Sequence, residues 1–169
     1  ERLYGKKFTV GIGRAYDTHP NIPHSYLEAL SALRFKVVKG QGEIIFVDEV
    51  PVNPQTILNY SLDMEKQLIN QLKTSDIDES RKSLDRILTS NLGKESSSPE
   101  LIQQLFRALV GTAVRTIYEI GATMEEVLGS DSSVYADTDN SSTLEEKRRV
   151  LISVFEAIQR YIQDRTENQ

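Results

Sequence analysis

The sequence predicts an α+β protein, in which a small strand–helix–strand unit is followed by a mostly helical bundle of four or five helices. Three observations support this fold class. Residues 6–13, KKFTVGIG, alternate polar and apolar side chains with the period of a half-buried strand. Residues 43–50, EIIFVDEV, have the pattern of a second strand, and after Leu58 apolar residues recur only at helical spacing. We therefore expect two domains, residues 1–52 and residues 58–166.

The helix of the first domain is expected within residues 25–39, SYLEALSALRFKVVK. Ser25 is a suitable N-cap, and Glu28 lies three residues further on, which is the spacing of a capping box. Gly40 follows the apolar pattern and is a natural stop. Residues 17–23 should form the turn that precedes this helix, because they contain Asp, Asn and Pro.

Two helices should open the second domain. The first begins at Ser61 and the second begins near Asp76. The link around Thr74 and Ser75 is short, which favours antiparallel packing of the two helices.

A long third helix should follow the loop at residues 93–100, GKESSSPE. Ser98 supplies the cap, Pro99 the first position and Glu100 an acid in the first turn. This helix should end near Gly121 and measure about 33 Å at about 1.5 Å per residue.

The remaining residues predict two more helices separated by a loop. Residues 123–129, TMEEVLG, should form one short helix, and residues 130–142, SDSSVYADTDNSS, a polar loop. Thr143 and Glu146 have the spacing of a second capping box, so the last helix should begin at Leu144 and extend to Ile162.

Composition excludes several classes of function. The net charge is −5, and the acidic excess lies after Tyr60, so we expect no direct contact with nucleic acid. The absence of cysteine excludes disulfides, zinc–thiolate sites and thiol nucleophiles, and it fits the cytoplasm. No apolar run is long enough to span a bilayer, so we expect no membrane contact. Because the chain begins with Glu1 and ends in a polar segment, we interpret it as a fragment of a larger protein.

The segment most suggestive of chemistry is residues 8–17, FTVGIGRAYD. A dinucleotide fingerprint would need a third glycine where Tyr16 stands, and a P-loop would need Gly-Lys-Ser/Thr. We therefore interpret Gly11 and Gly13 as glycines that let the strand pack closely or turn. Arg14 is the single candidate ligand-binding residue.

Other polar residues do not form a recognisable catalytic or metal pattern. His19 and His24 flank a turn and have only Asp17 nearby as a further ligand. No Gly-x-Ser-x-Gly elbow is present, and the acids within residues 131–139 lack the spacing of a calcium loop. We predict no catalytic residue, no metal site and no cofactor, and hence that the chain is not an enzyme.

A charge run and four aromatic residues complete the candidates. Residues 145–150, EEKRRV, are interpreted as a solvated helix face, with contact to a neighbouring domain as the alternative. Core packing is expected for the aromatic residues on the apolar helix faces: Phe106, Tyr118, Phe155 and Tyr161.

The front of the chain resembles the carboxy-terminal third of a GGDEF-type domain. It is more similar to the degenerate GGDEF-like region of large Gram-positive regulators of the AraC type (YesN-like). The residues that carry the closer similarity are Val10, Gly11, Ile12, Gly13, Arg14, Ser25, Tyr26, Glu28, Ala29, Ala32, Leu33, Gly40, Ile44, Ile45, Asp48 and Glu49. In these regulators an all-helical stretch follows, which Glu65, Leu68, Ile69, Leu72, Lys73, Asp76, Leu84 and Leu88 resemble.

The resemblance implies a non-catalytic, signal-transmitting middle region of an AraC-type transcriptional regulator. The cyclase signature and the AraC-type helix-turn-helix are both missing, so the DNA-binding part is expected downstream of Gln169. Partners would be the other domains of the parent regulator and a second copy in a homodimer. An exposed sheet edge is expected, because upstream strands would be missing. The parent would be cytoplasmic, either free or anchored to the membrane. The alternative is a sensor that binds a small molecule between the bundle and the strand unit.

Overall fold

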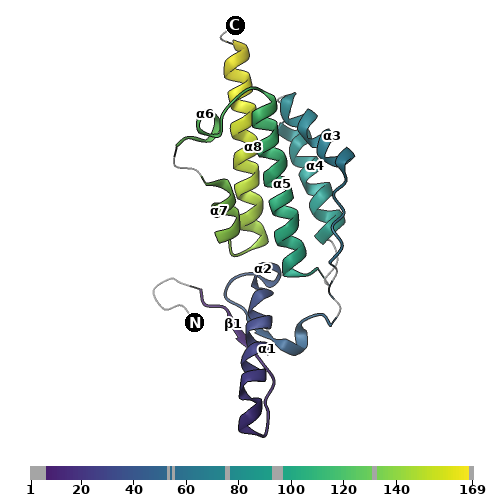
Figure 1. Cartoon of the computed structure of the whole chain (residues 1–169), viewed down its shortest axis with the longest axis vertical. Coiled ribbons are helices and arrows are strands. Elements are labelled where there is room, and N and C mark those ends of the chain that lie inside the picture. Colours follow the sequence, from purple (N-terminus) through teal and green to yellow (C-terminus); the bar gives the residue numbers. More distant parts are fainter. Residues whose placement is uncertain are drawn as a thin grey trace.

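The structure is a computed structural model of the chain, and it describes residues 7–52, 54, 56–74, 77–92, 97–130 and 133–167. Two parts lie end to end in Figure 1: a strand unit (residues 8–50) and a helical bundle (residues 62–167). The architecture is mostly helical with one small sheet, which agrees with the predicted fold class.

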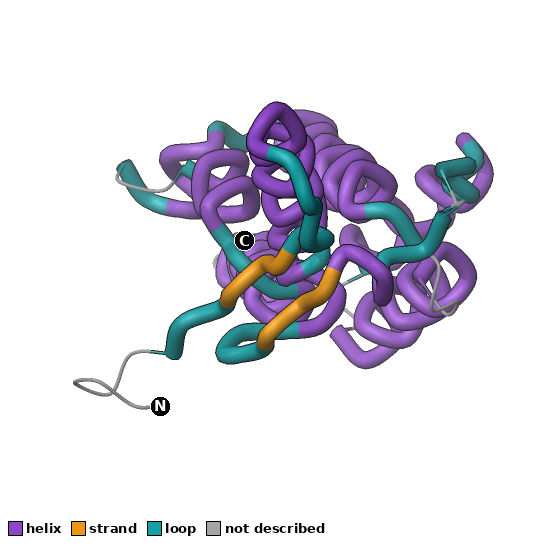
Figure 2. The backbone as a smooth tube through the Cα atoms, turned by 90° about the horizontal axis from the view of Figure 1, so that it is seen from below, coloured by secondary structure: helices purple, strands orange, loops and turns teal. Residues whose placement is uncertain are grey.

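The strand unit is a parallel β–α–β arrangement. Strand β1 (Val10–Ile12) pairs with β2 (Ile44–Phe46), with Val10 opposite Ile44 and Ile12 opposite Phe46. Helix α1 (Ile22–Arg34) makes the crossover that parallel strands require. Figure 2 shows the two strands side by side. Three shorter helical segments complete the unit: η1 (His19–Asn21), α2 (Lys36–Lys39) and η2 (Val47–Glu49).

Helix α1 begins earlier than the sequence predicts. Its N-cap is Asn21 and it starts at Ile22, so the expected capping box of Ser25 and Glu28 is wrong. A proline in the first turn fits this early start, because its fixed backbone angle suits the beginning of a helix. The carboxylate of Glu28 is occupied elsewhere, by Arg14 and Tyr16. Gly40 ends α2 with a φ of 102°, as expected of a glycine stop.

The two glycines of β1 allow the strand to lie directly against α1. A Cβ atom on Gly11 would lie 2.2 Å from the carbonyl oxygen of Ala29, and one on Gly13 would lie 2.0 Å from that of Ser25. Neither position has room for a side chain, so the interpretation of these glycines as close-packing residues is confirmed.

This packing turns the apolar face of β1 away from the helix. The alternating pattern predicted a half-buried strand, but Phe8 and Val10 are exposed, and so are Ile44 and Phe46 of β2. The inward position of β2 is Ile45, which forms a small core with Ala32 and Phe35. Within the described residues each strand pairs only with the other, and the exposed sheet edge stays a prediction.

The bundle contains six helices in the described residues, one more than the upper number predicted. They are α3 (Leu62–Lys73), α4 (Ile77–Leu92), α5 (Pro99–Glu119), α6 (Met124–Leu128), α7 (Val134–Asn140) and α8 (Leu144–Glu167). The extra helix is α7, which occupies the predicted loop at 130–142. Its Val134 and Thr138 are buried, so tertiary packing stabilises a helix that the polar sequence alone does not predict.

The predicted helix starts in the bundle are confirmed where they can be examined. Ser61 Oγ accepts from the backbone of Met64 at 3.3 Å, and Ser98 Oγ accepts from Leu101 at 3.0 Å. Thr143 and Glu146 form the reciprocal bonds of a capping box. The expected link residue Ser75, the start at Asp76 and residues 93–96 of the predicted loop lie outside the described residues.

The main core lies between α3, α4, α5 and α8. Its fully buried side chains include Leu68, Leu84, Leu105, Phe106 and Phe155. Every helix in the described residues is too short or too polar to cross a membrane.

Candidate functional site

The strand unit and the bundle meet at a narrow, largely polar junction. Arg34 Nη1 of α1 lies 3.4 Å from Glu100 Oε1 at the start of α5. Gln41 Nε2 donates to Glu146 Oε1 at 2.9 Å, which joins the loop before β2 to the first turn of α8. Val37 of α2 adds an apolar contact with the main core.

A cavity of about 430 Å³ lies at this junction. We call it the junction cleft. Its residues come from both parts of the molecule and are Arg34, Val37, Pro99, Glu100, Gln103, Asp139, Ser141 and Lys147. The cleft therefore lies between the strand unit and the bundle.

Lys147 is the most unusual residue of the cleft. Its side chain is buried, with 6% of the residue exposed, and its ammonium donates to the backbone carbonyl of Thr138. Burial lowers the pKa of Lys147, while the carboxylates of Asp139 and Glu146 oppose that shift. A lysine is rarely buried this far without a structural or functional reason.

This position corrects the interpretation of residues 145–150 as a solvated face. Lys147 is buried, Arg148 donates to Asp85 Oδ1 of α4 at 2.7 Å, and Glu146 reaches the strand unit through Gln41. Only Glu145 and Arg149 of the charged residues in this run are exposed. The sequence could not indicate the burial of Lys147, because its charge is the same as that of Arg148 and Arg149. The packing of α7 against α8 is what sets it apart.

Asp139 also lines the cleft and is held in place by an arginine of α5. Arg107 donates to its two carboxylate oxygens, from Nε at 3.2 Å and from Nη2 at 3.0 Å. These hydrogen bonds lower the pKa of Asp139, so it remains ionised and fixed in orientation. Asp131, from the same acidic segment, lies outside the described residues.

The predicted ligand residue, Arg14, lies in a different place, at the end of β1. Its Nε donates to Asp48 Oδ1 at 2.8 Å and its Nη1 donates to Glu28 Oε1 at 3.1 Å. Its backbone N–H also donates to Glu28 Oε2 at 2.8 Å, and Tyr16 donates its hydroxyl to Glu28 Oε1 at 2.9 Å. The two carboxylates already accept hydrogen bonds from the guanidinium. A ligand-binding role for Arg14 stays a prediction.

The Arg14 network joins residues from three elements of the strand unit. Arg14, Glu28 and Asp48 are far apart in the sequence, and the structure brings them into one cluster. The backbone N–H of Arg14 is the main cause that lowers the pKa of Glu28. The cluster joins β1, α1 and η2, so its visible role is to hold the strand unit together.

The histidines do not come together with other metal-ligating groups. His19 lies in η1 and His24 in the first turn of α1, and both are exposed. Over the described ranges, no three His, Cys, Asp or Glu side chains are placed to hold a metal ion.

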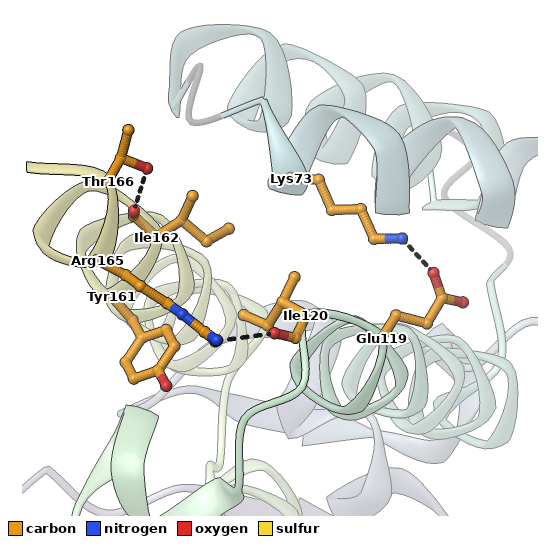
Figure 3. Close-up of a pocket in the computed structure, with 7 residues that line it drawn as sticks. All are labelled: Lys73, Glu119, Ile120, Tyr161, Ile162, Arg165 and Thr166. Carbon is orange, nitrogen blue, oxygen red and sulfur yellow. Dashed lines mark hydrogen bonds and ion pairs between the residues drawn. The ribbon is translucent and has the colours of Figure 1, made fainter. Parts of the chain in front are cut away.

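A second cavity, of about 300 Å³, lies at the far end of the bundle between the ends of α3, α5 and α8. Figure 3 shows its polar groups engaged with each other: Lys73 pairs with Glu119, and Arg165 Nη1 donates to the carbonyl of Ile120 at 3.3 Å. Thr166 likewise donates to the carbonyl of Ile162 at 2.8 Å. These contacts lie at the ends of α3, α5 and α8, and every residue that lines this cavity belongs to the bundle.

The aromatic residues largely follow the prediction of core packing. Phe106 and Phe155 are fully buried, and Tyr161 is partly buried beside the far cavity. Tyr118 is the exception, since it is 63% exposed and lies outside the core.

A scan against protein-family models gave no match, and searches of curated proteins and of solved structures gave no significant match.

Proposed function

We propose that the chain is a non-catalytic, signal-transmitting middle region of an AraC-type transcriptional regulator. The single observation that carries this proposal is the course of α8. Its first turn contacts the strand unit through Glu146 and Gln41, and its other end lies at the opposite tip of the bundle (Figure 1). At about 1.5 Å per residue, its 24 residues span about 36 Å.

The packing of α8 suits a rigid connector. Leu151, Phe155 and Ile158 are fully buried along its length, so the helix would move as one body with its neighbours. The junction depends instead on exposed polar contacts such as Arg34–Glu100, which contribute little stability. In this proposal the strand unit changes its position at the junction, and α8 carries that change to the DNA-binding part downstream of Gln169.

The exposed face of the sheet is where we place the preceding domain of the parent regulator. Parallel sheets are ordinarily covered on both faces, and here the face that bears Val10, Ile44 and Phe46 is open. Ile44 is 58% exposed and Phe46 is 46% exposed, in a unit whose own buried core is small. This surface favours an intramolecular partner, and a homodimer through the same face is the competing outcome.

The two outcomes can be separated by hydrogen exchange and sedimentation on the chain alone and on a longer native chain. If the preceding domain covers the sheet, the amides of β1 and β2 exchange more slowly in the longer chain, and both proteins sediment as monomers. Concentration-dependent dimerisation that Phe46→Ser abolishes would assign the face to a second copy instead. Val52→Ser is the matched control, because Val52 is exposed outside the sheet.

The transmission proposal is tested by measuring the junction directly. The chain has no cysteine, so spin labels can be placed at His24→Cys in α1 and Arg160→Cys in α8, both of which are exposed. We expect Gln41→Ala combined with Arg34→Ala to broaden the distance distribution between the labels, because both polar links are removed. Arg149→Ala, an exposed change on α8, should leave it unchanged.

The identity of the parent is tested separately. The native reading frame should encode a helix-turn-helix after Gln169, and the longer protein should bind DNA in a mobility-shift assay. A frame that ends or continues without such a motif removes the AraC-type assignment.

The second candidate function is a small-molecule sensor. The observation that favours it is the junction cleft, because a ligand there would touch both parts of the molecule.

A further inference from the structure

The junction cleft combines charges of both signs in one small space. Arg34 and Lys147 contribute two cations, and Glu100 and Asp139 contribute two carboxylates. A site of this composition disfavours ligands that carry several charges of one sign, such as nucleotides. It is complementary to a molecule that carries one positive and one negative group.

The charged groups of the cleft differ in how firmly they are held. Asp139 is fixed by two hydrogen bonds from Arg107, and Lys147 is fixed by burial and by the Thr138 carbonyl. Arg34 and Glu100 lie at the exposed rim, 3.4 Å apart. Of these four charged residues, Lys147 is buried, whereas Asp139, Arg34 and Glu100 are exposed.

Lys147 has the capacity to bind an anionic group. An ammonium has three N–H donors, and one hydrogen bond is present to Thr138 in the described structure. Keeping a cation in a buried position is unfavourable unless other groups compensate it. The carboxylates of Asp139 and Glu146 provide part of that compensation, and a ligand carboxylate would add to it where a cavity reaches the side chain.

The apolar walls and the size of the cleft restrict the ligand further. Val37 and Pro99 provide an apolar surface, while Gln103 and Ser141 provide hydrogen-bonding groups. A volume of about 430 Å³ lies within the range of about 300–1,000 Å³ that small-molecule pockets occupy.

We propose that the junction cleft binds a zwitterionic small molecule of the amino-acid class. The ligand carboxylate pairs with Lys147, its ammonium pairs with Asp139 and Glu100, and its side chain lies against Val37 and Pro99. Because these residues belong to α2, α5, α7 and α8, the bound ligand bridges the two parts of the molecule. This inference deepens the sensor alternative, and its link to transcription rests on the proposed function.

Binding is tested with the common free amino acids, one at a time, on the whole chain. We expect at least one of them to raise the melting temperature and to give saturable heat in calorimetry. For that amino acid, the N-acetyl derivative lacks the ammonium and the carboxamide lacks the carboxylate, so each should bind more weakly. If no amino acid binds, or if both derivatives bind as well as the parent, the proposal is wrong.

The role of Lys147 is tested by Lys147→Met, which keeps an unbranched side chain in the buried position. Loss of a charge-assisted bond should weaken binding about tenfold or more. Arg149→Met is the matched control, since Arg149 is an exposed cation on the same helix and does not line the cleft. Equal affinity in the two variants would overturn the assignment.

A second variant keeps the test decisive if Lys147→Met does not fold. Glu100→Gln changes an exposed residue of the rim and should weaken binding of the amino acid but not of its N-acetyl derivative. With the spin labels in place, the bound ligand should narrow the distance distribution across the junction. If no amino acid binds, two experiments that need no ligand still test the proposed function. They are the label experiment without ligand and the search for a downstream helix-turn-helix.

Discussion

Arg14 donates from Nε to Asp48 Oδ1 at 2.8 Å, which ties the end of β1 to the turn that follows β2. The two residues are 34 positions apart in the sequence. The same arginine also holds Glu28 of α1, so the end of β1, α1 and η2 are joined at one point. A motif that suggested a phosphate loop is therefore, in its visible contacts, a structural clamp.

The clamp predicts an acid sensitivity of the strand unit. The pKa of Glu28 is lowered in the folded state from its ordinary value of 4.5, mainly by the backbone N–H of Arg14. Its contribution to stability is therefore complete above about pH 4.5 and is lost as the pH falls through the lowered pKa. Hydrogen exchange of residues 8–50 should show faster opening across this window.

The Glu28→Gln variant should lose most of this pH dependence, because it cannot ionise. Glu43→Gln, which changes an exposed glutamate of the same unit, should retain it. A wild-type pH profile that persists in Glu28→Gln would show that another group governs the acid response.

The close approach of β1 and α1 predicts a severe effect of a single methyl group. Gly13→Ala would place its Cβ 2.0 Å from the Ser25 carbonyl oxygen, which the backbone can relieve only by separating the strand from the helix. We expect a loss of about 1–3 kcal/mol or more in the opening free energy of the strand unit, measured by hydrogen exchange.

Gly111→Ala is the control for this substitution. Its Cβ would meet only the Tyr135 hydroxyl at 4.0 Å, so alanine should be neutral or stabilise α5 by up to about 1 kcal/mol. Similar effects of the two substitutions would contradict the close packing at Gly13.

Asn91 predicts a second sensitive position, in the bundle. Its side chain accepts from the backbone N–H of Asn59 at 2.7 Å and donates to the Asn59 carbonyl at 2.9 Å, with 1% of the residue exposed. Asn91→Ala would remove both hydrogen bonds to the Asn59 backbone, each of which contributes about 0.5–1.5 kcal/mol, and should cost about 1–3 kcal/mol in urea unfolding. Asn70→Ala, at an exposed position of α3, should change the unfolding free energy little. Equal losses of unfolding free energy in the two variants would contradict the role of the Asn91–Asn59 hydrogen bonds.

Tyr60 predicts an alkaline transition. Burial raises its pKa to about 12, and its hydroxyl lies 2.8 Å from Thr112 Oγ1. Above its ordinary value of 10.0, the phenol ionises in the unfolded chain before it does so in the folded chain, so stability should fall as the pH rises towards about 12.

Ultraviolet titration of the tyrosines checks this directly. Tyr60→Phe should remove the ionisation step at the highest pH, whereas Tyr118→Phe, at an exposed residue, should leave that step in place. Persistence of the step in Tyr60→Phe would show that a different tyrosine is the buried one.

Short sequence patterns predicted several of the local elements of this protein. The cap residues Ser61, Ser98 and Thr143 located three helix starts correctly, because a cap depends on a hydroxyl and the next few backbone N–H groups. The strand–helix–strand order and the close-packing role of the two glycines were likewise predictable from short patterns.

Which side chains are buried depends on contacts between segments that are distant in the sequence. Ser25 and Glu28 had the spacing of a capping box, but Glu28 bonds to Arg14, which lies fourteen residues earlier. The apolar residues of β1 face outward because the helix takes the glycine side of the strand. Helix α7 and the burial of Lys147 depend on neighbours that the local sequence does not specify. Caps and periodicity act over one or two turns, whereas burial is a property of segments brought together from across the chain, so the junction cleft becomes visible only in the folded molecule.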